Sequence, residues 1–211
     1  MKVSEKVAEI LLDIKAVNLN AQKPYHWVSG IIAPIYTDCR LVMGYPEDRS
    51  YVADQMVKVI QEQIGEDNID IIAGVSTSGI PHAAWVADRL NMPMIYVRGS
   101  KKDHGKENLI EGVLEKGQRA VLIEDLVSTG GSSIKSIEAI REQGGICDYQ
   151  ISLFTYGLPK AKENFSNAGV TTFPLTNFAA LVDAAVKNGY LEGGDKELVL
   201  EWSKSPETWG K

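Results

Sequence analysis

Apolar positions along the chain fall into two kinds of pattern, short runs and helical spacings. The runs predict strands over 69–73, 94–97, 121–123 and 150–154. The helical spacings, with their caps and glycine stops, predict a first helix capped by Ser4 and further helices over about 50–64, 81–90, 132–143 and 195–203. Because strands and helices alternate, we expect an α/β fold, with a doubly wound, mainly parallel sheet and helices on both faces.

Length and composition fit one domain of this kind. The chain has 211 residues, 44% of them hydrophobic, so a single domain over 1–211 is expected. Cys39 and Cys147 lie far apart and lack metal-ligand spacing, so we expect reduced, packed thiols and a cytoplasmic protein. No apolar run approaches the ~20 residues of a membrane span, and the start of the chain lacks a signal-peptide pattern. The net charge of −6 argues against a nucleic-acid partner.

Two carboxylates follow the apolar run 121–123, and a turn of small residues follows them. The strand is predicted to end where Glu124 and Asp125 begin, and the turn 128–132 reads Ser-Thr-Gly-Gly-Ser. Backbone N–H groups in such a turn, at the start of a helix, bind anions such as a phosphate. The carboxylates could hold ribose hydroxyls, carry Mg²⁺ through water, or balance positive charge on a sugar ring. An ordinary βα turn with solvated acidic caps would explain the helix, but not two carboxylates at a strand end.

Two further segments are expected near the same edge of the sheet. The segment 98–112 gathers Arg98 and four more basic or histidine side chains on an acidic protein, and such a local field attracts an anion like pyrophosphate. Taken alone, it could also be a solvated charged turn. The turn 74–81 contains Ser76, Thr77 and Ser78, and its spacing alone does not distinguish an anion site from a glycine-permitted βα turn.

Together these segments resemble a known family. The acidic pair and its turn resemble the phosphoribosyl diphosphate (PRPP) motif of type I phosphoribosyltransferases, and 98–105 reads R-G-S-K-K-D-H-G, similar to the basic loop R-x-x-x-K-D-H-G of orotate phosphoribosyltransferases. Upstream, 27–40 looks like the N-terminal hood of that family. Downstream, 154–158, FTYGL, is similar to the branch of the family common in Gram-positive bacteria.

The resemblance implies a type I phosphoribosyltransferase fold with a small hood contributed largely by about 1–45. It implies Mg²⁺-dependent transfer of the 5-phosphoribosyl group from PRPP to orotate, which gives orotidine 5′-monophosphate and pyrophosphate in de novo pyrimidine biosynthesis. It also implies a homodimer in which the basic loop serves the partner's site, and Mg²⁺ held through PRPP and water rather than by direct protein ligands.

Residue roles carried over from the family are as follows. Catalytic roles fall on Lys102, His104 and Asp125. PRPP binding falls on Arg98, Lys102, His104, Glu124, Asp125, Leu126, Val127, Ser128, Thr129, Gly130, Gly131 and Ser132. Orotate binding falls on Ser128 and Tyr36, and the pyrophosphate loop is Ser76, Thr77 and Ser78.

The sequence departs from the family pattern where orotate would bind. Some members have a lysine in the hood, which 27–36 lacks, and an arginine after the last core strand, where 154–156 reads Phe-Thr-Tyr. Backbone amides near Tyr36, the Ser128 hydroxyl and Arg40 remain as donors for the orotate carboxylate. Two alternatives stay open: a phosphoribosyltransferase for another nucleobase, and a non-catalytic PRPP-sensing regulator. Both should lack the K-D-H-G loop.

Overall fold

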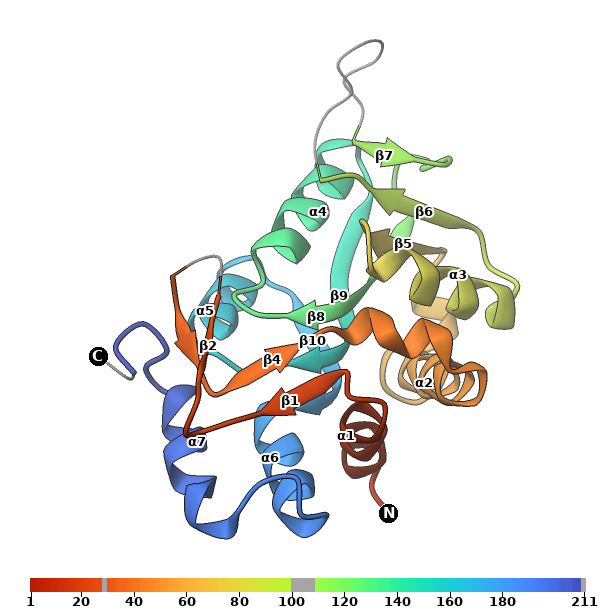
Figure 1. Ribbon diagram of the computed structural model, residues 1–211. Coiled ribbons are helices and arrows are strands. Elements are labelled where there is room, and N and C mark those ends of the chain that lie inside the picture. The colour runs from red at the N-terminus through yellow and green to blue at the C-terminus, as the bar shows by residue number, and fades with distance from the viewer. Residues whose placement is uncertain (28–29, 100–108, 210–211) are drawn as a thin grey trace.

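A six-stranded sheet forms the centre of the computed structural model, which describes residues 1–27, 30–99 and 109–209. The strand order is β10-β9-β8-β5-β6-β7, and every neighbouring pair is parallel except β6 and β7 (Figure 1). The strands are β5 (Ile71–Val75), β6 (Met94–Val97), β7 (Ile110–Glu111), β8 (Arg119–Val127), β9 (Ile146–Thr155) and β10 (Thr171–Asn177). The expected doubly wound, mainly parallel sheet is confirmed.

Helices cover both faces of this sheet. They are α1 (Val3–Asp13), α2 (Pro46–Val59), α3 (Gly79–Leu90), α4 (Gly131–Glu142), α5 (Pro159–Asn167), α6 (Phe178–Lys187) and α7 (Lys196–Trp202). A π-helical turn, Ile60–Ile64, continues α2, and short 3-10 turns span Cys39–Gly44, Glu66–Asn68 and Gly193–Asp195. One hydrophobic core joins the sheet to α1, α2, α3 and α6, and a second joins it to α4 and α5.

The central strand β8 contributes to both cores. Val121 and Ile123 belong to the core beneath α1, α2, α3 and α6, whereas Ala120 and Leu122 belong to the core beneath α4 and α5. All four side chains are 2% exposed or less. A strand buried on both faces needs no polar alternation, which explains the uninterrupted apolar run in the sequence.

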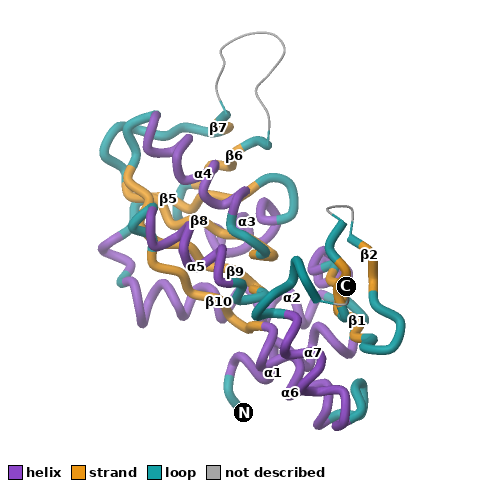
Figure 2. The backbone as a smooth tube through the Cα atoms, turned by 90° about the vertical axis from the view of Figure 1, so that its left-hand side faces the viewer, coloured by secondary structure: helices purple, strands orange, loops and turns teal. Residues whose placement is uncertain are grey.

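The N-terminal strands form two small antiparallel sheets. β1 (Val17–Leu19) pairs with β4 (Ile35–Thr37), and β2 (Tyr25–His26) pairs with β3 (Ile32–Ala33). Trp27 packs against the rings of Tyr156 and Trp202 at centroid distances of 5.2 and 5.4 Å. The indole N–H of Trp202 in α7 also donates to the carbonyl of Ile32 at 3.1 Å. Aromatic packing thus joins these strands to α7, which lies beside β1 and β2 in both views (Figure 2).

Several element boundaries differ from the expected ones. The first helix begins at Val3, with Lys2 rather than Ser4 at the N-cap, and α2 begins at Pro46, whose fixed φ suits a first helical position. The elements α5, β10 and α6 were not predicted. β10 contains Pro174, which a strand at the edge of a sheet tolerates because one side of its backbone makes no ladder bonds.

Candidate active site

The acidic pair lies inside β8, not after it. The expected strand end at Ile123 is wrong, because β8 continues through Glu124 and Asp125 to Val127. Glu124 is 5% exposed and Asp125 is 8% exposed. The Ser133 hydroxyl of α4 donates to Glu124 Oε2 at 3.1 Å, and the carboxyl groups of Glu124 and Asp125 contact each other. Glu124 therefore joins the pair to α4, and Asp125 lies within electrostatic range of Arg40 beside the N-terminal strands.

Burial changes the acidity of both carboxyl groups. Burial, followed by the negative charge of neighbouring Asp125, raises the pKa of Glu124 to about 8. Burial also raises the pKa of Asp125 above its ordinary value, while the positive charge of Arg40 acts the other way. At neutral pH Glu124 therefore carries a proton in the free protein, and a ligand that needs the ionised pair must displace that proton.

The small-residue turn positions the start of α4 at the end of β8. Gly130 is the N-cap residue, with φ +78°, and no side chain among the described residues caps this helix. A Cβ at Gly130 would lie 2.8 Å from the Phe165 ring of α5. Asn164 of α5 donates to the carbonyl of Thr129 at 2.9 Å. The start of α4 therefore has N–H groups without a side-chain cap and is supported by α5, so it is a candidate anion site.

The turn 76–78 lies next to this anion site, because β5 and β8 are neighbours in the sheet. The Ser76 N–H donates to the carbonyl of Val97 at 3.0 Å, and the Ser76–Thr77 peptide is cis. Gly79, which opens α3, packs so closely on β8 that a Cβ there would lie 2.5 Å from the carbonyl oxygen of Ile123. The structure therefore brings the two predicted turns to one edge of the sheet.

Arg98 joins both turns at one cavity. A cavity of about 370 Å³ is lined by Ser76, Arg98 and Ser132, together with Lys135 of α4. Arg98 is held at the end of β6 by its N–H, which donates to Leu109 at 2.8 Å, and by an ion pair with Glu111 at 3.4 Å. The predicted catalytic residues Lys102 and His104 lie outside the described residues.

The N-terminal strands place further groups on the Asp125 side of the sheet. Tyr36 of β4 is 48% exposed, and its ring centroid lies 5.8 Å from that of Tyr25. Arg40 is held by Asp38 through a 2.7 Å ion pair. Burial, followed by the charge of Asp125, raises the pKa of the Cys39 thiol, so the segment 38–40 lies within electrostatic range of the acidic pair. Tyr36 and Arg40 are thus exposed polar groups near Asp125.

Sequence reasoning missed three residues of this site. Ser133, Asn164 and Lys135 were not assigned, although Ser133 lies in the first turn of the helix whose start was predicted and Lys135 follows that turn. The sequence did contain a sign of the role of Ser133. A hydroxyl in the first turn of a helix can reach back to the strand that precedes the helix. Asn164 lies on α5, an element that was not predicted.

Residues 50–156 match the family model described as phosphoribosyl transferase domain. With the buried acidic pair and the uncapped helix start at one sheet edge, this match defines the class: the chain is a phosphoribosyltransferase, a glycosyltransferase enzyme. It is 48% identical to orotate phosphoribosyltransferases of Listeria monocytogenes serovar 1/2a and Enterococcus faecalis V583, over all of this chain and 100% and 99% of those proteins. The chain belongs to the orotate phosphoribosyltransferase family.

Solved structures show the same fold. Orotate phosphoribosyltransferase from Aeropyrum pernix superimposes with a TM-score of 0.75 at 30% identity, over 88% of this chain and 99% of that one. The UMP synthase of Leishmania donovani superimposes with a TM-score of 0.77 at 28% identity, over 94% of this chain and 42% of that one. No helix among the described residues is long and apolar enough to cross a membrane.

Proposed function

We propose that the chain transfers the 5-phosphoribosyl group of PRPP to orotate in the presence of Mg²⁺. The products are orotidine 5′-monophosphate and pyrophosphate, and the reaction is a step of de novo pyrimidine biosynthesis in the cytoplasm. One observation carries this proposal: a buried carboxylate pair lies beside the uncapped start of α4. That pairing suits a sugar phosphate, whose phosphate binds backbone N–H groups while its hydroxyls bind carboxylates.

PRPP would lie along the edge formed by the two turns. The 5-phosphate binds the N–H groups of 128–132 at the start of α4. Asp125, supported by Glu124, accepts hydrogen bonds from ribose hydroxyls, and Leu126 and Val127 carry the backbone into the turn. The diphosphate extends toward Ser76, Thr77, Ser78 and Arg98, where the 370 Å³ cavity lies.

The reaction needs charge stabilisation rather than a protein nucleophile. The bond between C1 of ribose and the diphosphate oxygen breaks, the electron pair leaves with the diphosphate, and positive charge develops on the sugar ring. The ionised Asp125 stabilises that charge from a desolvated position. N1 of orotate then forms the new bond to C1 and releases its proton to the departing pyrophosphate, and the Arg98, Lys102 and His104 side chains neutralise that pyrophosphate.

The donor set around Asp125 fits Mg²⁺ held indirectly. No group of three or more metal-binding side chains occurs among the described residues, while two carboxyl groups lie side by side in β8. Mg²⁺ keeps several waters and commonly binds through substrate phosphates with one or two carboxylates. Glu124 and Asp125 would hold it through water and ribose hydroxyls, and the ion would supply charge neutralisation on the diphosphate.

Orotate would bind between the acidic pair and the N-terminal strands. Tyr36 offers an exposed ring and hydroxyl on β4, and the Ser128 hydroxyl follows β8 directly. The family lysine and arginine are absent here, so Arg40 is the cation available to the orotate carboxylate among the side chains near Asp125. We further propose one catalytic domain with a hood from about 1–45, and a homodimer in which Lys102 and His104 of the basic loop complete the site of the partner.

The test is a direct assay. Purified protein is mixed with PRPP, Mg²⁺ and orotate, and loss of orotate absorbance is followed. Uracil, adenine and hypoxanthine are run in parallel and scored by pyrophosphate release. We expect orotate-dependent turnover that vanishes when Mg²⁺ is chelated. Turnover of another base without turnover of orotate would overturn the base assignment, and silence with all four would overturn the catalytic one.

A further inference from the structure

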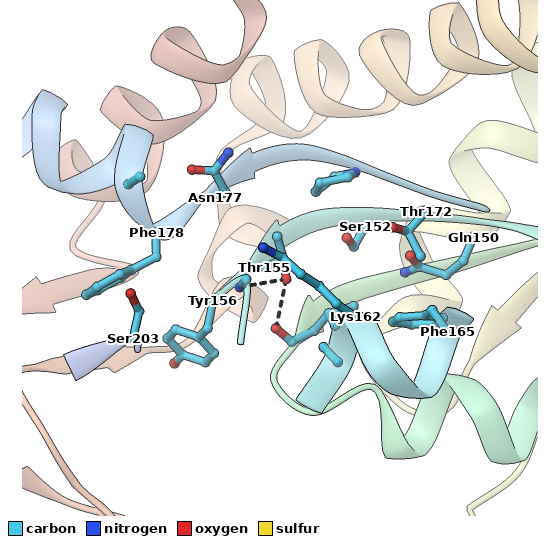
Figure 3. A pocket seen from close by; sticks show the side chains of 15 residues that line it. Gln150, Ser152, Thr155, Tyr156, Lys162, Phe165, Thr172, Asn177, Phe178 and Ser203 are labelled. Carbon is cyan, nitrogen blue, oxygen red and sulfur yellow. Dashed lines mark hydrogen bonds between the residues drawn. The ribbon is translucent and has the colours of Figure 1, made fainter. Parts of the chain in front are cut away.

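A second cavity, of about 410 Å³, lies beside α5. Its walls come from β9, β10, α5 and the start of α6 (Figure 3). Of the residues assigned to PRPP or orotate above, only Val127 lines it. The aromatic cluster of Tyr156, Phe178 and Trp202 separates it from the N-terminal strands, with ring centroids 5.2 to 6.5 Å apart.

Gln150 of β9 forms the deep end of this cavity. Its side chain is fully buried, at 0% exposure, yet neither Oε1 nor Nε2 has a hydrogen-bond partner among the described residues. A buried amide without partners destabilises the folded protein, because its polar atoms lose their hydrogen bonds to water. A protein keeps such a group where a ligand supplies the missing partners, and Gln150 presents one donor and one acceptor side by side.

Lys162 of α5 provides a positive charge in the same cavity. Its side chain runs across the middle of the cavity in Figure 3, between the Gln150 end and the Tyr156 end. None of the ion pairs described for this chain involves Lys162, whereas Lys160 on the same helix pairs with Glu163 at 3.0 Å. Lys162 is an exposed residue, and its ammonium is available to an anion that also reaches the Gln150 end of the cavity.

The remaining walls suit a planar ring. Phe165, Phe178, Ala161 and Pro174 line the cavity with apolar surface, and all but Pro174 are 5% exposed or less. Cavities of about 300–1,000 Å³ with apolar walls and a few convergent polar groups are typical small-molecule sites. A glutamine pairs in bidentate fashion with adjacent donor and acceptor atoms of a nucleobase.

We propose that this cavity binds a nucleoside monophosphate, with the base edge on the Gln150 amide and the phosphate on Lys162. The site is separate from the PRPP cradle but touches it through one helix. Phe165 lines the cavity and also packs on Gly130, and its neighbour Asn164 donates to the carbonyl of Thr129. A bound nucleotide would therefore press on the helix that supports the phosphate turn, and PRPP affinity would change with occupancy.

The test is isothermal titration calorimetry, which measures affinity and stoichiometry. AMP, UMP, CMP and GMP are each titrated into the full-length protein, with and without saturating PRPP and Mg²⁺. PRPP fills the cradle, so nucleotide that still binds reports the second site. We expect at least one nucleotide to bind PRPP-loaded protein with a stoichiometry of one per chain. Adenosine, uridine and inorganic phosphate, which each lack one half of the ligand, should bind at least tenfold more weakly.

Variants locate the site. Gln150→Leu keeps the side-chain size and removes the unpartnered amide, so the free protein should melt at the same or a higher temperature while nucleotide affinity falls at least tenfold. Lys162→Met should weaken binding by a similar factor, and Lys160→Met, two residues away on the same helix, should not. The proposal is overturned if no nucleotide binds PRPP-loaded protein, if phosphate alone binds equally well, or if neither Gln150→Leu nor Lys162→Met weakens binding. Turnover is not needed for any of these readouts, so failure of the orotate assay would leave them interpretable.

Discussion

The Ser133 hydroxyl donates a hydrogen bond of 3.1 Å to Glu124, which ties the first turn of α4 to the strand that carries the acidic pair. Asp125, the next residue, lies within electrostatic range of Arg40 and Cys39 beside the N-terminal strands. We therefore propose different tasks for the two carboxyl groups. Glu124 would link the start of α4 to the sheet, and Asp125 would be the carboxylate that meets the sugar.

Asp125→Asn should lower kcat/KM by at least a hundredfold without unfolding the protein. The amide keeps the shape but loses the negative charge that stabilises the sugar cation, and it also relieves repulsion with Glu124. Steady-state kinetics and thermal melting check this outcome, with Asp148→Asn, an exposed change on β9, as the control. A fully active Asp125→Asn protein would remove this residue from the mechanism.

The activity should depend on pH through Glu124. Its pKa is raised from 4.5 to about 8. At a pH between these two values, the carboxyl group is protonated in the folded protein and ionised in the unfolded chain. Stability of the free protein should therefore decrease as pH rises from about 4.5 to 8, and kcat/KM for PRPP should rise over pH 6 to 8 as the pair ionises. Glu124→Gln should flatten both profiles. Unchanged slopes in that variant would assign the titration to another group.

Gly130→Ala should cost both stability and PRPP affinity. The positive φ alone costs roughly 1–2 kcal/mol for a residue with a Cβ, and contact with Phe165 adds roughly 1–3 kcal/mol. Gly169→Ala is the matched control, because Gly169 also has a positive φ but nothing within 4 Å of the added Cβ. Denaturant unfolding and PRPP titration of both variants separate the backbone cost from the packing cost. Equal losses in the two proteins would contradict a packing role for Phe165.

Lys102→Ala should lower turnover by more than tenfold while PRPP still binds, because the lost charge acts on the leaving pyrophosphate. If the loop serves the partner's site, mixing Lys102→Ala protein with Asp125→Asn protein should restore part of the activity. In each mixed dimer, one of the two sites then combines an intact Asp125 with an intact Lys102. Activity is compared before and after subunit exchange, with exchange followed by mass. Confirmed mixed dimers without recovery would place each site within one chain.

The sheet and its phosphate turn could be predicted from the sequence because apolar runs and glycine stops are local signals. The end of β8 could not, because carboxylates inside a strand contradict strand propensity and are tolerated only where Ser133 and a ligand compensate for burial. α5 has only Ala161 and Phe165 as buried residues among polar neighbours, so its periodicity is weak. The sequence does contain a signal for α6, because Asn177 is a favourable N-cap residue before an apolar run. The preceding strand β10 contains Pro174, which argues against a strand there, so the β10–α6 unit was not predicted.

The Trp202 hydrogen bond to Ile32 joins residues 170 positions apart in the chain, and Thr176 makes a similar bond to the carbonyl of Ser4 across 172 positions. A ribosome adds about 5–20 residues per second. The N-terminal strands therefore leave the ribosome roughly 10 to 30 seconds before the helix that anchors them has been made. During that interval their aromatic side chains lack their native partners, so this segment of the nascent chain relies on chaperones for protection.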